Sequence, residues 1–494
     1  MDRLDTPRVH RLLASPVGGL FETAPFETLS LRRLPRQFAV RRARAAADVS
    51  LGAGPAAFLR EADAPPAPHL HDRVEAALAE FAEIRERHED VAERWEAAFW
   101  GDDDSTPDER VALERERRRA DAAHARPDDA FGFLVDDHLV PPVAFDVPPP
   151  DDARERWAHE LAEPERLYGF ADSTVTESLP RVSRSKTVFG PGTVEYRLRF
   201  ATPSLHVGDT AEARVYEPED AVDELSTVVF FSGLGSLGDR LGYWPEEEAV
   251  GRRLARRGYR VVLPDAPWHG RREPLGSYAG EPYLARGPVG HFELYGAAAQ
   301  EAGVLVEWAR SEGAPAVAVG GLSLGGIVAL HVAGRCGHWP ESMRPDLAAP
   351  VAAAGSVTQL LTGSRLVSLL GEDDALTAAG WTGDDLNEFA PLLNPPAKPS
   401  LSPERILACY GARDDVAPAA SFESLLRRWD VPRRNLVRWD RGHVGTAARL
   451  ARDDEFQRLL TAELDRLAAA NRRAERAAAD DGDEDADAAA ETTT

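Results

Sequence analysis

From Thr227 onward, short apolar segments alternate with helical patterns, and this alternation limits the possible folds more than any other feature of the chain. Segments that are apolar on both faces are typical of parallel strands buried between two layers of helices. We therefore expect an α/β fold with a mostly parallel sheet and helices on both faces. The expected strands span residues 228–231, 259–263, 316–320, 351–354, 405–410 and 435–439, and the expected helices span about 245–257, 294–311 and 326–333.

One turn between an expected strand and the next helix carries a serine. Gly321-Leu322-Ser323-Leu324-Gly325 follows the strand at 316–320 and precedes the helix at 326–333. A G-x-S-x-G turn in this position is typical of a nucleophile elbow, in which the serine has a strained backbone and the glycines leave room where a Cβ would collide. The free N–H groups of the following helix favour negative charge beside the hydroxyl. The turn therefore predicts that Ser323 is a nucleophile.

A nucleophilic serine needs a base that takes its proton and a third group that holds the base. In this arrangement the acid and then the histidine follow the serine along the chain, each after a later strand. Asp414 and Asp415 follow the strand at 405–410, and His443, the only one of 13 histidines downstream of that acid, follows the strand at 435–439. We assign Asp414 because it lies closer to the strand end, and expect Asp415 to be solvated or to cap a turn.

The predicted oxyanion hole consists of backbone N–H groups. One is that of Leu324, directly after the nucleophile, and the other comes from the loop after an earlier strand. That loop is Phe231-Ser232-Gly233-Leu234-Gly235, and the N–H of Leu234 is the candidate. Trp268 and His269 follow the strand at 259–263, at the edge where substrates bind in such sheets. His269 is a candidate for lining the pocket or orienting a substrate, and packing or capping in its loop is an equal alternative.

The oxyanion loop also matches a dinucleotide-binding pattern. Gly233-Leu234-Gly235-Ser236-Leu237-Gly238 has the form G-x-G-x-x-G after a strand. That pattern must open its helix directly, but residues 239–244 intervene before the expected helix start at Pro245. Glu246, Glu247 and Glu248 would then repel a diphosphate. No group of His, Cys and carboxylates has metal-site spacing, so we expect neither cofactor nor metal.

Residues 1–190 differ in pattern from the rest of the chain. Residues 71–100 form a long amphipathic helical pattern, and Thr106 as N-cap with Pro107 starts a second, charged helix to about Ala123. We expect a helical N-terminal extension and then a hydrolase domain over 191–470 that begins with antiparallel strands at 193–200 and 211–216. A cap insertion is expected at about 355–400. Residues 471–494 are rich in alanine and acid and are expected to form a disordered tail.

The charge of the chain is strongly negative. Acidic residues number 83 against 58 basic residues, only Lys186 and Lys398 are lysines, and the net charge is −25. Such a surface suggests a salt-accumulating cytoplasm, because concentrated salt screens self-repulsion. A GC-rich genome would explain the scarcity of lysine but not the acidic excess. The charge argues against nucleic-acid binding. No apolar run is long enough to span a bilayer, no secretory signal pattern is present, and the two cysteines predict reduced thiols, so we expect a cytoplasmic protein.

These motifs resemble the α/β-hydrolase superfamily over roughly residues 225–470. Within it, the chain is most similar to the abhydrolase-domain-containing eighteen group, a branch of serine hydrolases. The wider superfamily commonly has His-Gly at the oxyanion loop, where this chain has Ser232-Gly233. The resemblance implies the roles already given for Ser323, Asp414 and His443, and for the subgroup it implies acyl-ester or lipid substrates. It rests on Gly233-Leu234-Gly235, Gly238-Asp239, Trp244, the segment 266–274, the segment 321–326, His338-Trp339-Pro340, Asp414 with Pro418, and Gly442-His443.

The sequence therefore predicts a serine hydrolase that cleaves a carboxylic ester or thioester through an acyl-enzyme on Ser323. The expected substrate is a small molecule or a lipid acyl ester, with peripheral membrane contact as an option. Leucines in the expected cap are candidates for an apolar acyl pocket, and equally for the core face of a cap helix. Peptidase or amidase activity is the alternative within the fold. A non-catalytic binding or scaffold protein is the alternative of another class.

Overall fold

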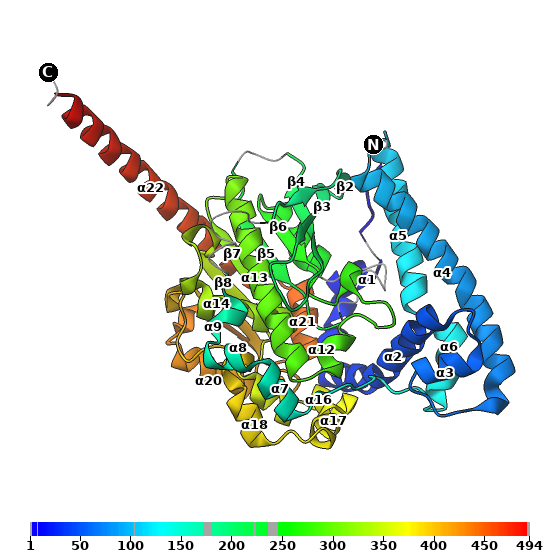
Figure 1. The fold of residues 1–494 in the computed structure, drawn as a ribbon. Helices are drawn as coiled ribbons and strands as arrows, with labels where there is room; N and C mark the ends of the chain where they lie inside the picture. Colours follow the sequence, from blue (N-terminus) through cyan, green and yellow to red (C-terminus); the bar gives the residue numbers. More distant parts are fainter. Residues whose placement is uncertain are drawn as a thin grey trace.

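A ten-stranded sheet forms the centre of the protein (Figure 1). The computed structural model describes residues 2–6, 8–102, 104–170, 180–220, 224–235 and 246–491. The strands follow the order β1-β3-β4-β6-β5-β7-β8-β9-β10, with β2 paired to β3. All neighbouring pairs from β6 to β10 in this order are parallel. The pairs of β3 with β1, β2 and β4, and the pair of β4 with β6, are antiparallel. The α/β fold with a mostly parallel sheet is thus confirmed. The strands are β1 (Ser183–Arg184), β2 (Val188–Gly190), β3 (Thr193–Ala201), β4 (Thr210–Pro218), β5 (Thr227–Phe231), β6 (Arg260–Pro264), β7 (Val317–Leu322), β8 (Leu347–Val351), β9 (Ala408–Gly411) and β10 (Leu436–Trp439).

Helices cover both faces of the sheet, and alternate strand residues point to each face. On one face Val229 and Phe231 of β5 pack with α13 and α14 in the largest apolar cluster. On the other face Val228 and Phe230 pack with α11, α21 and α22 in a second cluster. Both layers bury the parallel strands, which explains why these strands read as continuous apolar runs. The covering helices are α11 (Arg253–Ala255), α13 (Val289–Ser311), α14 (Leu324–Arg335), α20 (Ala419–Arg428), α21 (His443–Arg452) and α22 (Glu455–Glu491).

The N-terminal region is helical as predicted. Two of its helices, α4 (His71–Trp100) and α5 (Pro107–Ala125), form an antiparallel hairpin. Thr106 caps α5 in a capping box with Glu109, so the predicted N-cap is confirmed. The strands β1 and β2 precede residue 191 and already belong to the sheet. The other elements of this region are α1 (Arg8–Ala14), η1 (Pro16–Glu22), α2 (Ala24–Ser50), α3 (Pro55–Glu61), η2 (Pro68–Leu70), α6 (Asp128–Asp136), α7 (Pro150–Arg156), α8 (Ala158–Ala162) and α9 (Glu165–Tyr168).

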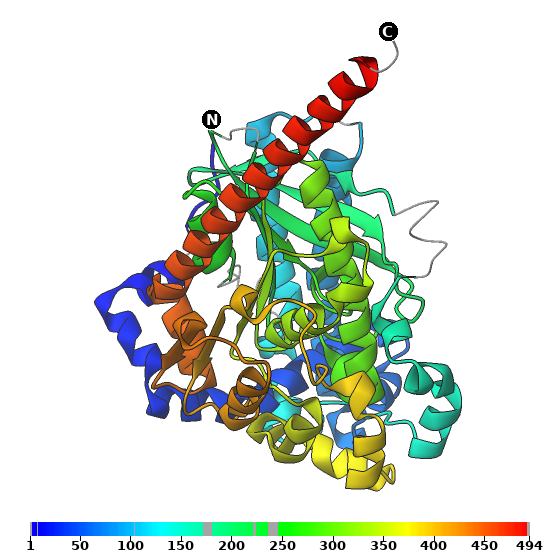
Figure 2. The ribbon, with the colours of Figure 1, turned by 90° about the vertical axis from the view of Figure 1, so that its left-hand side faces the viewer.

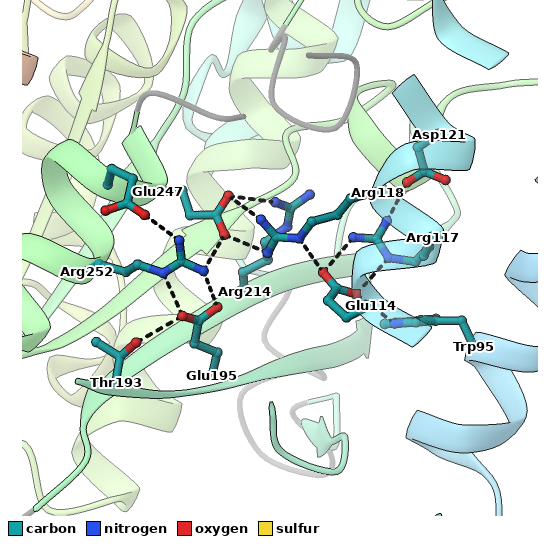
Figure 3. A network of polar contacts seen from close by, with 11 residues as sticks. Trp95, Glu114, Arg117, Arg118, Asp121, Thr193, Glu195, Arg214, Glu247 and Arg252 are labelled. Atoms are coloured by element: carbon teal, nitrogen blue, oxygen red, sulfur yellow. Dashed lines mark hydrogen bonds and ion pairs between the residues drawn. The ribbon is translucent and has the colours of Figure 1, made fainter. Parts of the chain in front are cut away.

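The hairpin is linked to η4 (Glu247–Arg252), and through it to β3, by a network of buried charges, which we call the charged seam (Figure 3). Glu114 of α5 accepts hydrogen bonds from Arg117 and Arg118, each at 2.8 Å. Arg118 also forms an ion pair with Glu247, at 2.6 Å. Arg252 forms ion pairs with two carboxylates, Glu247 at 3.3 Å and Glu195 at 2.7 Å. The Arg117 and Arg252 side chains are fully buried. We define the charged seam as Glu114, Arg117, Arg118, Glu195, Glu247 and Arg252.

Five short helices lie between β8 and β9, where the cap insertion is expected. Leu361, Val367 and Leu370 of this segment are buried, Leu361 and Leu370 in the largest apolar cluster, while Leu360 and Leu366 are half-buried against that cluster. The three buried residues therefore form the core face of their helices. The helices are α15 (Val357–Gly363), α16 (Arg365–Leu370), α17 (Glu372–Ala378), α18 (Gly383–Glu388) and α19 (Ala390–Leu393). The remaining short elements are η5 (Gly270–Arg272), α12 (Glu281–Ala285), η6 (Cys336–His338), η7 (Glu341–Met343), η8 (Pro403–Arg405) and η9 (Arg433–Asn435).

One expected helix differs in the structure. The helix expected over 245–257 consists of a π-helix, η4 (Glu247–Arg252), followed by the single turn of α11. Its Glu247 and Glu248 face arginines rather than solvent, because each forms ion pairs with Arg252. Residues 236–245, which hold the end of the G-x-G-x-x-G pattern, lie outside the described residues.

The predicted disordered tail also differs from the structure, which continues α22 to Glu491. Alanine is the strongest helix former, and Asn471 ties this part of the helix to the domain by donating to Pro315 O at 2.9 Å and to Asp346 at 3.0 Å. Within the described ranges, neither α22 nor another helix combines the length and the apolar character needed to cross a bilayer.

Candidate active site

Ser323 lies in the sharp turn between β7 and α14. Its backbone has φ 57° and ψ −114°, a conformation that non-glycine residues rarely adopt. A Cβ on Gly321 would collide with the backbone of Gly325, and a Cβ on Gly325 would collide with that of Phe231. Both glycines are therefore required by space, and the turn lifts Ser323 onto the carboxyl edge of the sheet.

The three residues predicted to act together lie in hydrogen-bond contact. His443 Nε2 is 2.9 Å from Ser323 Oγ, and His443 Nδ1 is 2.7 Å from Asp414 Oδ2. His443 begins α21, and Asp414 follows β9, so each side chain comes from the end of a different parallel strand. With the proton on Nδ1 facing Asp414, Nε2 can accept the hydroxyl proton of Ser323.

The two neighbouring aspartates have different surroundings. The Asp414 side chain is 1% exposed, and its second oxygen accepts the N–H groups of Val416 at 3.0 Å and Ala417 at 2.8 Å. The Asp415 side chain is 56% exposed and faces Arg365 at 3.5 Å. Asp414 is thus the carboxylate held rigidly against His443, and Asp415 is the solvated neighbour.

The electrostatic surroundings favour a protonated His443. Burial by itself lowers the pKa of the imidazole, but the Asp414 charge and its hydrogen bond outweigh this effect, with smaller contributions from Glu27 and Asp415. The pKa of His443 is therefore raised above its usual value. The arrangement stabilises the imidazolium that forms when the ring takes a proton.

The loop after β5 packs directly beside Ser323. A Cβ built on Gly233 would lie 3.5 Å from the Ser323 Cβ, and Gly325 N donates to Ser232 O at 3.1 Å. Among the described residues, no acceptor takes the N–H of Leu234 or of Leu324. The loop predicted for the oxyanion hole is thus adjacent to the serine.

Trp268 and His269 are both buried, with 8% and 2% of their surface exposed. Trp268 has a φ of 62°, and its carbonyl accepts the N–H of Gly280 at 3.0 Å. A Cβ on Gly280 would lie 2.8 Å from both His269 Nε2 and Leu234 Cδ1, so His269 lies beside the oxyanion loop. Substrate contact by Trp268 and His269 remains a prediction.

One carboxylate near His443 was not singled out by the sequence patterns. Glu27, in the first turn of α2, is 7% exposed and accepts the N–H of Val444 at 3.4 Å. No local motif marks it, because it lies 417 residues from Val444 in the chain. In the described part of the chain, no group of three or more His, Cys, Asp and Glu side chains is arranged to hold a metal ion.

A family model places the chain in a known class. The model of the alpha/beta hydrolase family matches residues 228–489, which is more than half of the 494 residues. The chain therefore belongs to the alpha/beta hydrolase family, the class that its sheet order and strand-turn-helix serine also indicate. A search of the curated proteins found no match.

Solved structures match the fold over somewhat more than half of the chain. An acetyl xylan esterase from Paenibacillus sp. R4 is 16% identical, with 58% of this chain and 89% of that chain covered and a TM-score of 0.42. Acetyl xylan esterase 1 from Thermoanaerobacterium sp. JW/SL YS485 is 17% identical, with 62% of this chain and 96% of that chain covered and a TM-score of 0.41. An S-formylglutathione hydrolase from Agrobacterium tumefaciens is 17% identical, with 57% of this chain and 98% of that chain covered and a TM-score of 0.39. At this level, the similarities carry no information on substrate.

Proposed function

We propose that the protein is a serine hydrolase that cleaves a carboxylic ester or thioester through an acyl-enzyme on Ser323. The proposal rests on one observation: His443 contacts both partners, with Nε2 2.9 Å from Ser323 Oγ and Nδ1 2.7 Å from Oδ2 of the buried Asp414. Ser323 is the nucleophile, His443 the general base and then the acid, and Asp414 the group that orients the ring and stabilises its protonated form.

In the proposed reaction, Ser323 Oγ attacks the carbonyl carbon while its proton passes to His443 Nε2. The carbonyl oxygen becomes an oxyanion that accepts the N–H groups of Leu324 and Leu234, and each such donor contributes about 3 kcal/mol in the transition state. His443 then gives its proton to the leaving alcohol or thiol as the carbon–oxygen or carbon–sulfur bond breaks. In the second half, water attacks the acyl carbon while His443 takes its proton. His443 then returns a proton to Ser323 Oγ as the acyl–Oγ bond breaks and the carboxylic acid leaves.

Several features support an acyl-ester substrate over an amide. Half-buried Leu360 and Leu366 lie in the segment between β8 and β9, which we propose as a cap over the serine. Their apolar surface would suit an acyl chain, from a small molecule or from a lipid at a membrane surface. The motif similarity to the abhydrolase-domain-containing eighteen group points the same way. We further propose a cytoplasmic location and adaptation to concentrated salt, on the basis of the net charge of −25.

A fluorophosphonate probe in concentrated salt tests the reaction class. We expect covalent labelling of the wild type and none of Ser323→Ala. Asp414→Asn should lower the labelling rate by about 10⁴-fold, because the ring loses its orienting charge. Asp415→Asn is the matched control, and a change of less than threefold is expected. Absence of labelling in folded wild type would favour the non-catalytic binding protein.

Nitrophenyl esters of increasing chain length test the acyl preference. We expect kcat/KM to rise with acyl length, because each buried methylene contributes about 0.8 kcal/mol. A flat series would remove the lipid proposal and leave a small-molecule ester. Faster turnover of matched nitroanilides than of the esters would instead support the peptidase or amidase alternative.

A further inference from the structure

The first helices of the chain pack against α21, the helix that begins with His443. We call the segment formed by α1, η1 and α2 the N-terminal arm, residues 8–50. Figure 2 shows the arm in blue beside α21 in orange, and contacts of α21 with all three arm elements agree with this view. Glu22 at the end of η1 forms an ion pair with Arg441, with Nε 3.1 Å from Oε2, and a second ion pair with Arg452. The arm is therefore fixed to both ends of α21 through charge pairs.

The carboxylate of Glu27 lies at the N-terminus of α21. It accepts the N–H of Val444 at 3.4 Å. Burial raises the pKa of Glu27, and the neighbouring backbone N–H of His443 opposes that rise. The N-cap residue of α21 is Gly442, which has no side chain to satisfy these donors. Glu27 thus provides, from a distant part of the chain, the negative charge that the start of a helix favours.

Gly442 supports this arrangement independently. Its φ of −87° is open to any residue, so backbone conformation does not require glycine here. A Cβ at this position would collide with the Glu27 carboxylate. The glycine before His443 is therefore needed to admit Glu27.

From these contacts we infer that Glu27 is a positioning residue for His443, and that the N-terminal arm is part of the catalytic apparatus. The inference rests on the proposed serine-hydrolase function. Glu27 holds the first turn of α21 in place through its N–H groups, and it sets a second carboxylate beside an imidazole that already faces Asp414. The arm thus contributes to the chemistry without touching substrate.

The groups that face His443 define the expected pH effect. Asp414 and Asp415 lie on the loop after β9, Glu27 lies on α2, and all three favour the imidazolium. The nearby cations are engaged elsewhere, Arg441 with Glu22 and Arg365 with Asp415. Burial raises the pKa of Glu27, and the N–H of His443 and the His443 charge oppose that rise.

The sign of the pH effect follows from these charges. His443 must be neutral to act as base, so activity rises with pH through its pKa. Replacing Glu27 by glutamine removes one charge that favours the imidazolium while keeping an oxygen acceptor. The pKa of His443 then falls, and the acid limb of the pH–rate profile moves to lower pH.

The pH profile of fluorophosphonate labelling, measured on the full chain, tests the inference. With each profile normalised to its own plateau, we expect the acid limb of Glu27→Gln to lie at lower pH than that of wild type. Glu61→Gln removes the same charge from the exposed end of α3 and is the control, with an unmoved acid limb. An acid limb of Glu27→Gln that coincides with wild type would overturn the inference. Wild type unlabelled at every pH would instead overturn the proposed function.

A double-mutant cycle tests the positioning separately from charge. Glu27→Ala should slow plateau labelling about tenfold, because the first turn of α21 loses its anchor. Gly442→Ala should also be slow, since its methyl displaces Glu27. In the Glu27→Ala background the same Gly442→Ala change should cost less than twofold. Full independence of the two substitutions, in proteins with wild-type circular dichroism, would contradict the inference.

Discussion

Helix α13 and helix α5 both pack against the same sheet, but with different chemistry. Nearly all of α13 is buried among apolar residues such as Phe292, Leu305 and Val306. Helix α5 is linked to η4, and through it to β3, by the charged seam, in which arginines and carboxylates alternate (Figure 3). Apolar packing tolerates small shifts, whereas a buried charge needs its partner at a fixed place. The second interface is therefore the more specific and the more vulnerable to single substitutions.

The largest effect should come from breaking the charged seam at Arg252. Arg252→Met leaves Glu195, Glu247 and Glu248 without their shared cation, and the expected loss is about 3–5 kcal/mol of unfolding free energy. Urea denaturation in constant high salt measures it. Arg256→Met is the matched control, because Arg256 pairs with the same Glu248 but is 44% exposed, and a loss below about 1 kcal/mol is expected. Equal losses would show that burial does not decide the strength of the seam.

A cavity in the apolar interface should have a somewhat smaller effect. Leu305 is fully buried in α13, and Leu305→Ala removes its methyl groups and leaves a void. We expect a loss of about 2–4 kcal/mol in the same denaturation experiment. Leu305→Met, which nearly conserves volume, should cost less than about 1.5 kcal/mol. If the methionine variant were as unstable as the alanine variant, shape rather than volume would limit this interface.

The smallest expected effect concerns a polar pair within the apolar interface. His291 of α13 and Glu372 of α17 are both buried, with 3.3 Å between His291 Nε2 and Glu372 Oε1. Burial lowers the pKa of His291 to about 3 and raises the pKa of Glu372 well above its usual value. Because the pKa of Glu372 is higher folded than unfolded, its contribution to stability is present at low pH and is lost as pH rises. Glu372→Gln stays neutral, so its stability relative to wild type should increase from pH 5 to pH 8, by about 1.4 kcal/mol for each unit of pKa shift.

Thermal unfolding of both proteins across that range measures the effect, with exposed Asp374→Asn as control. A wild type that becomes the more stable protein at pH 8 would mean that Glu372 is ionised and paired with a charged His291.

The same contrast explains what the sequence could predict. Most strands from β5 to β10 and the helix α13 are visible because apolar burial leaves a periodic pattern within a few residues. The exception is β8, which was expected at residues 351–354 and lies at Leu347–Val351. Ser323, Asp414 and His443 were found because each follows a strand in a fixed order, and the structure brings them into contact. The assignment of their catalytic roles still depends on the labelling experiments.

Contacts between distant charges left no such pattern. Arg118 and Glu247 are 129 residues apart, and each reads in isolation as a solvated side chain. The contact of Glu27 with α21 was likewise invisible, although Gly442 before His443 was a signal that something approaches closely there. The end of the G-x-G-x-x-G pattern, residues 236–238, lies outside the described residues.

The contact of Glu27 with the first turn of α21 has a consequence for synthesis on the ribosome. The N-terminal arm is made before any strand of the sheet, and His443 is made after the last one, β10. The contact of the arm with α21 can therefore form only after α21 leaves the ribosome, although α2 can pack earlier against α3 and α6. A nascent chain that stopped within the sheet would hold Ser323 without His443, so the contact of these two side chains forms only near the end of translation.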